Sequence, residues 1–276
     1  MKKILSMLLV LCMALTLCSA AFAEGKSPVD GMTVAFIPKV SGNSFFEAAN
    51  DGAQKYAADW GLTVDYIGAP TADVTTQLEL IQQAIDKGVD AICISSVDAT
   101  GLDEKLQEAQ DAGIFVSTWD SDVSPDARAL MISQGTADVL GPMLVDMAVD
   151  SLTERGVDVN GEVKYVWHFS NPSVSDQNSW YVAGDAYIKE KYPTWVAVND
   201  PYYSNQDPAQ SVSVGESILD AYPDIDVIIC NDSTALPGQC KAAENKGKTA
   251  KDITITGFCP PSGMTCLLYT SDAADE

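Results

Sequence analysis

Polar side chains follow three of the apolar runs of this sequence, at the point where each run ends. The first run precedes a lysine, the second two aspartates, and the third an Asp-Gln pair: Lys39, Asp120, Asp122, Asp176 and Gln177. Open α/β sheets bind ligands at the carboxyl ends of their strands, so we expect these side chains to converge on one cleft. Carboxylates, an amine and an amide can accept and donate hydrogen bonds, which suits a small polyhydroxylated ligand. Asp122 can also cap the turn that follows it, so we rank Asp120 first.

Aromatic residues lie beside the expected cleft. Phe45 and Phe46 fall in the first turn of a predicted helix, and we expect one to pack in the core and the other to form a wall for a ring. We expect Trp119 and Trp180 to pack in the core. His168 is the only histidine of the chain, so it cannot build a histidine metal cluster, and we predict no metal, cofactor or catalytic residue.

Short apolar strands alternate with helical segments along the whole chain, which predicts parallel sheets with helices on both faces. We expect strands at 32–37, 62–67, 90–95, 114–119, 162–168, 195–198, 226–230 and 253–256. We expect helices from Ser44 to Gly61, with Glu47 completing a capping box, and at 73–87, 101–112, 137–154, 177–191, 208–221 and 235–246.

The order of strands and helices occurs twice in the chain, because the segment 223–229 is similar in sequence to 87–93. We therefore predict an α/β fold of two Rossmann-like, doubly wound lobes with a hinge and an interlobe cleft. The predicted lobes span 24–134 and 135–257, and a second crossover spans 258–265.

We expect the two ends of the chain to lie outside this fold. Residues 1–23 have the basic, apolar and small-residue order of a signal peptide cleaved after Ala23, which predicts export. A lipid anchor at Cys18 is the less favoured alternative. Residues 266–276 resemble the translation of a sequencing adapter, so we expect the natural sequence to depart from this one after Thr265 and the first lobe to lack a return segment.

The formal net charge of −23 repels phosphate backbones and anionic lipid, which argues against nucleic acid as a partner. Cys93 and Cys230 lie within apolar runs and are expected to be small buried residues. A disulfide between Cys240 and Cys259 is left open.

Several stretches together resemble the type I periplasmic binding proteins of sugar ABC importers, and most closely their autoinducer-2-binding branch. The likeness runs from about 33 to 258. It is carried by 35–39, 118–122, 134–136, 143–148, 172–178 and 235–237.

The resemblance implies that Lys39, Asp120, Asp176 and Gln177 hold a ligand. In the family a proline and an alanine flank a later aspartate, whereas this chain has Asn231 and Ser233 around Asp232. The implied function is that of a monomeric, extracytoplasmic solute-binding protein without catalysis. It would capture autoinducer-2 or a related pentose or deoxyhexose and deliver it to the permease of an ABC importer. The alternative is an exported carbohydrate-active enzyme that uses Asp120 and Asp176 as a carboxylate pair.

Overall fold

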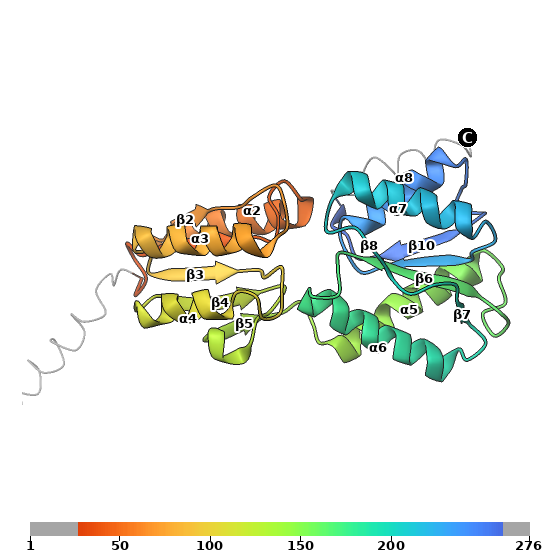
Figure 1. The fold of residues 1–276 in the computed structure, drawn as a ribbon, viewed down its shortest axis with the longest axis horizontal. Helices are drawn as coiled ribbons and strands as arrows, with labels where there is room; N and C mark the ends of the chain where they lie inside the picture. The colour runs from red at the N-terminus through yellow and green to blue at the C-terminus, as the bar shows by residue number, and fades with distance from the viewer. Residues whose placement is uncertain (1–26, 262–276) are drawn as a thin grey trace, which may run out of the picture.

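The structure is a computed structural model that describes residues 27–261. The predicted signal peptide and the segment 266–276 lie outside the described residues. Two parallel sheets of five strands each occupy separate halves of the molecule (Figure 1). Within the described range, no helix has the length and apolar character needed to cross a membrane.

The first half is built on a sheet with the strand order β2-β1-β3-β4-β5. Its strands are Thr33–Ile37 (β1), Thr63–Tyr66 (β2), Ala91–Ile94 (β3), Phe115–Trp119 (β4) and Leu130–Ile132 (β5). Its helices are Ser44–Trp60 (α2), Val74–Lys87 (α3) and Asp103–Asp111 (α4), followed by a short 3-10 turn at Pro125–Ala127. Buried residues of α3 and α4 pack on one face of the sheet, and Phe46 of α2 packs on the other.

The second half has the strand order β10-β9-β6-β7, and β8 also pairs with β6. Its strands are Lys164–Phe169 (β6), Val196–Ala197 (β7), Tyr202–Tyr203 (β8), Val227–Cys230 (β9) and Thr254–Gly257 (β10). Its helices are Ala137–Glu154 (α5), Ser175–Lys191 (α6), Pro208–Ala221 (α7) and Ala235–Asn245 (α8). Helices α5 and α6 cover one face, and α7 and α8 cover the other.

Both sheets are doubly wound, as predicted. The chain runs from β1 to β2 on one side and then returns to add β3 on the other, and it does the same around β6. The strand order therefore reverses between β1 and β3 and between β6 and β9. The carboxyl ends of strands at such reversals are the ligand sites of open α/β sheets.

Two details of the predicted elements were wrong. Strands β5 and β8, which are three and two residues long, were not predicted, because neither carries a run of alternating polarity. The cap of α2 is Asn43 instead of Ser44: its side chain accepts from the backbone N–H of Phe45 at 2.9 Å. Glu47 still reaches back, but it accepts from the N–H of Gly42 at 2.7 Å. The domain boundaries remain predictions.

All four cysteines of the described region are free thiols, so the disulfide between Cys240 and Cys259 that the sequence left open is not formed. Cys230 is fully buried, as expected, whereas Cys93 is only partly buried.

Helices α5 and α6 touch through glycine. A Cβ atom on Gly141 would lie 2.6 Å from the backbone nitrogen of Gly184 and 2.7 Å from the carbonyl oxygen of Trp180. Backbone atoms cannot move aside cheaply, so the close approach of these helices requires a residue without a side chain.

We expect Gly141→Ala to lower the free energy of unfolding by about 1–3 kcal/mol, because the added methyl group overpacks this contact. Gly52→Ala is the matched control: a Cβ atom on Gly52, in α2, would meet nothing within 4 Å, and this variant should gain about 0.5–1 kcal/mol of helix stability. Urea unfolding of both variants measures the difference. Equal stability of Gly141→Ala and the parent chain would contradict the packing argument.

Candidate ligand-binding site

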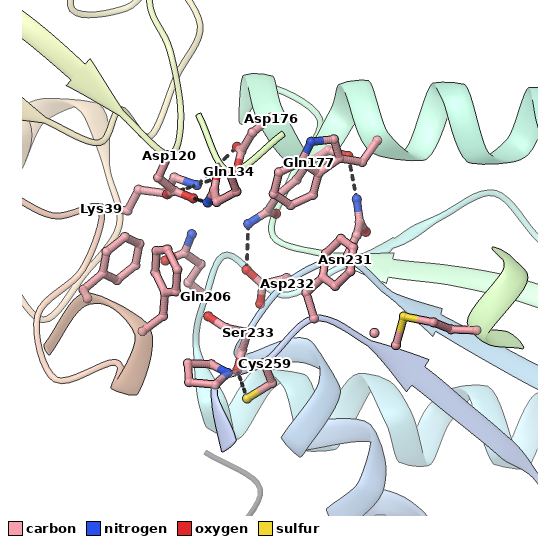
Figure 2. Close-up of a pocket in the computed structure, with 17 residues that line it drawn as sticks. Lys39, Asp120, Gln134, Asp176, Gln177, Gln206, Asn231, Asp232, Ser233 and Cys259 are labelled. Atoms are coloured by element: carbon pink, nitrogen blue, oxygen red, sulfur yellow. Dashed lines mark hydrogen bonds and ion pairs between the residues drawn. The ribbon is translucent and has the colours of Figure 1, made fainter. Parts of the chain in front are cut away.

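A cavity of about 470 Å³ lies between the two halves at the carboxyl ends of their strands. Its volume is typical of small-molecule sites. Side chains from both halves approach it in Figure 2. All of the predicted site residues except Asp122 line it.

Lys39 is the charged centre of the cavity. It follows β1, and its Nζ lies 2.9 Å from Asp120 Oδ2 and 3.2 Å from Asp176 Oδ1. The lysine side chain is only 2% exposed, and both carboxylates are 7% exposed. Burial acts to lower the pKa of Lys39, but attraction by Asp120 and Asp176 outweighs it and raises that pKa. The ammonium stays charged and joins a carboxylate of each half.

Asp120 follows β4 and is held in an unusual backbone conformation. Its φ of +62° lies in the left-handed region, which costs a residue other than glycine about 1 kcal/mol or more. Its N–H donates to the carbonyl oxygen of Ile132 at 3.0 Å, and Ser95 Oγ donates to its carboxylate at 2.7 Å. The amide of Gln134 donates to the other carboxylate oxygen. These contacts hold the carboxylate toward Lys39.

Asp176 lies in the first turn of α6 and reaches the same ammonium from the second half. The hydroxyl of Ser121 also donates to it. Burial raises the pKa of Asp176 to about 6, against the attraction of Lys39, which lowers it. The carboxyl group therefore changes charge at a higher pH than an ordinary aspartate.

A second polar cluster forms the wall contributed by β9 and α6. Gln177 donates to Asp232 at 2.8 Å, and the other carboxylate oxygen of Asp232 accepts from the N–H groups of Thr234 and Ala235 at 2.9 and 2.8 Å. Burial raises the pKa of Asp232, although these backbone donors lower it. The Asn231 amide nitrogen donates to the carbonyl oxygen of Gln177 at 2.5 Å, while its Oδ1 is buried without a partner among residues 27–261.

One of the two phenylalanines is packed in the core, as expected, and the other is more exposed. Phe46 is 2% exposed and packs edge-on against Trp119 with ring centroids 5.7 Å apart. Phe45 is more exposed and stacks on Trp119 at 6.2 Å. Both phenylalanines line the cavity. Trp180 is buried as predicted, but it also forms part of the cavity wall.

Asp122 departs from the expectation and does not line the cavity. Its carboxylate accepts two hydrogen bonds from Arg128, at 2.8 and 3.1 Å, and one from Thr118 at 2.5 Å. Burial acts to raise the pKa of Asp122, but the bonds from Arg128 and Thr118 lower it. The left-handed turn at Asp120 sends the two aspartates to different partners.

Some cavity residues were not assigned from the sequence. The most informative is Gln206, which lies in the loop between β8 and α7 with φ +57°. It is 5% exposed, and its Oε1 is buried without a partner in the described part of the chain. The polar run before Pro208 could have indicated it. The others are Gln134, Met147, Gly257, Phe258, Cys259 and Pro260.

No group of three or more potential metal ligands is found within residues 27–261. His168 is fully buried, with Nδ1 2.7 Å from Gln239 Nε2, and burial lowers its pKa to about 3. It packs in the second half, outside the cavity.

Comparison with known proteins agrees with this geometry. A family model described as a periplasmic binding protein domain matches residues 34–268. LsrB from Clostridium saccharobutylicum, solved in complex with AI-2 (autoinducer-2), is 57% identical; the match covers 87% of this chain and 74% of that one, with a TM-score of 0.86. An ABC transporter solute-binding protein from Clostridium phytofermentas, solved with bound L-rhamnose, is 25% identical over 85% of this chain and 71% of its own, with a TM-score of 0.78.

A sugar-binding protein is also similar to this chain over most of its length. The D-ribose/D-allose-binding protein of Pseudomonas aeruginosa is 24% identical over 269 residues, which are 94% of this chain and 81% of that protein. The family consists of binding proteins that work outside the cytoplasm, so the enzyme alternative is not supported. Asp120 and Asp176 also share one ammonium instead of standing as an acid and a base. The chain belongs to the periplasmic binding protein domain family, as a type I solute-binding protein.

Proposed function

We propose that this protein captures a small sugar-like ligand, AI-2 or a related pentose or deoxyhexose, and delivers it to the permease of an ABC importer. The predicted signal peptide would export the chain before it binds. Ligand would bridge the two halves and stabilise their closed arrangement, because only closure brings both sets of contacts together. The permease would then recognise the closed form.

The observation that carries this proposal is the set of buried polar groups that the two halves present to one cavity. Lys39 can donate to a hydroxyl or carbonyl oxygen, and Asp120 and Asp176 can accept from hydroxyl groups. The amide oxygens of Gln206 and Asn231 are buried without partners among the described residues. An unpaired buried acceptor is costly, and a ligand hydroxyl would relieve that cost.

AI-2 is our first candidate ligand. The similarity to LsrB solved with AI-2 is 57% in identity, against 25% for the protein solved with L-rhamnose. Lys39, Asp120, Asp176 and Gln177 match the pattern that the family resemblance implies for AI-2, whereas Asn231 and Ser233 depart from it. The departures alter one wall of the cavity, so a pentose or deoxyhexose is the next candidate.

A thermal-shift screen tests the proposal directly. We expect stabilisation by AI-2, or by a pentose or deoxyhexose such as L-rhamnose, because a ligand that binds only the folded state raises its melting temperature. Stabilisation by amino acids or peptides and by no sugar-like compound would overturn the proposed function.

We expect Asp120→Asn to weaken AI-2 binding about tenfold to a hundredfold, or ~1.5–3 kcal/mol, because it removes a charged acceptor from a buried site. Asparagine tolerates the left-handed conformation of this position, so the backbone should hold. Asp122→Asn is the matched control and should change affinity little, since Asp122 is bonded to Arg128 outside the cavity. Isothermal titration calorimetry compares the two variants, and the reverse order would contradict the geometry.

Ligand affinity should fall as the pH drops from 7.5 to 5, by up to about tenfold. The pKa of Asp176, which faces Lys39 and Asp120, is about 6 instead of its ordinary 3.8. Its contribution to the stability of the ligand-free protein is therefore present below about pH 3.8 and is lost as the pH rises through about 6. A ligand hydroxyl that donates to the carboxylate favours the deprotonated form, so binding strengthens over the same window. Calorimetry at several pH values should show this slope, and Asp176→Asn should flatten it; an unchanged slope would assign it to another group.

A further inference from the structure

Three side chains bond the two halves to each other at the edge of the cavity. Asn43 precedes α2 in the first half, and Ser233 and Thr234 precede α8 in the second. The amide nitrogen of Asn43 lies 3.1 Å from Ser233 Oγ and 3.0 Å from Thr234 Oγ1. Ser233 Oγ also lies 3.3 Å from the amide oxygen of Asn43. We call this bridge, between residues about 190 positions apart, the latch.

The hydroxyl and the carbonyl oxygen of Ser233 are committed to the protein. Its hydroxyl lies within hydrogen-bond distance of both ends of the Asn43 amide, and its backbone carbonyl accepts from the Cys259 thiol at 3.6 Å. Burial raises the pKa of Cys259 to about 11, so this thiol keeps the proton that it donates. Asn231 differs, because its amide oxygen has no partner within residues 27–261. Of the two departures from the AI-2 pattern, Ser233 is thus the one whose side-chain hydrogen bonds are already made.

Asn43 is oriented before the latch forms. Its amide oxygen accepts from the N–H of Phe45 at 2.9 Å and so caps α2. The cap turns the amide nitrogen toward the second half. Because the side chain is already ordered, forming the latch costs little additional rotamer entropy.

We propose that the latch raises ligand affinity by stabilising the closed arrangement, and that the hydroxyl of Ser233 does so without bonding to the ligand. This inference rests on the proposed function. Bonds that join two halves are broken when the halves separate, so they shift the population of closed protein. Apparent affinity scales with the population of the binding-competent form. Ser233 is therefore a positioning residue, and loss of its hydroxyl lowers the affinity for every ligand by the same factor.

Variants of both partners test the latch. Ser233→Ala removes one hydroxyl, and Asn43→Ser keeps an N-cap residue on α2 while its side chain is too short to bridge the halves. Each variant should weaken the binding of AI-2 and the binding of L-rhamnose by the same factor, about threefold to tenfold. In the double variant, Ser233→Ala should add nothing to Asn43→Ser. Ser217→Ala removes a hydroxyl that donates to the carbonyl of Ser213 in the same helix, and it should leave affinity unchanged.

A different result overturns the latch. If Ser233→Ala has no effect, discriminates between the two ligands, or keeps its full effect in the Asn43→Ser background, then Ser233 does not act through Asn43. Where only one of the two sugars binds, the double-variant comparison on that sugar decides.

Small-angle X-ray scattering of the ligand-free protein provides a readout that needs no ligand. Asn43→Ser should increase the radius of gyration relative to the parent chain, because more molecules are open; an unchanged radius would contradict the latch. If no sugar-like ligand binds but Asn43→Ser opens the protein, the proposed function fails and the effect of the latch on closure stands. If AI-2 binds normally to all variants, the latch fails and the proposed function stands.

Discussion

The ion pairs of Lys39 are the interaction on which the arrangement of the two halves depends. A buried ammonium is several kcal/mol less stable than a hydrated one unless opposite charges surround it. Asp120 supplies one such charge from the first half and Asp176 the other from the second. Two carboxylates then face one ammonium, which leaves an excess of negative charge at the junction. Burial, together with the repulsion from Asp120, raises the pKa of Asp176, so protonation of this carboxyl can remove the excess.

The remaining polar groups are held in place by bonds within the protein. The left-handed backbone at Asp120 and its bonds from Ser95 and Gln134 fix one wall. The chain of bonds through Gln177, Asp232 and the first turn of α8 fixes the opposite wall. Groups that are already oriented lose little freedom on binding, so more of the interaction free energy is available for affinity.

The departures from the AI-2 pattern have two different physical meanings. Under the proposed function Asn231 would act on the ligand directly, because its buried amide oxygen has no partner among the described residues. Ser233 bonds to Asn43 of the other half, and in our proposal this bond stabilises the closed arrangement. A residue that lines a cavity can thus influence binding through the protein as well as through the ligand.

The sequence by itself determined the elements and the strand ends that carry the site. Helices α5 and α7 begin and end where predicted, because their sequence signals act within a few positions of one another. In α7 the signal at the start is Asp207, whose side chain accepts from the N–H of Gln210. Only the tertiary structure decided which polar groups share a cavity. Asp120 and Asp122 are two residues apart, yet the first bonds to Lys39 in the cavity and the second to Arg128 outside it. Ser233 meets Asn43 from about 190 positions away, a separation at which pairing depends on how two sheets are brought together and not on local sequence.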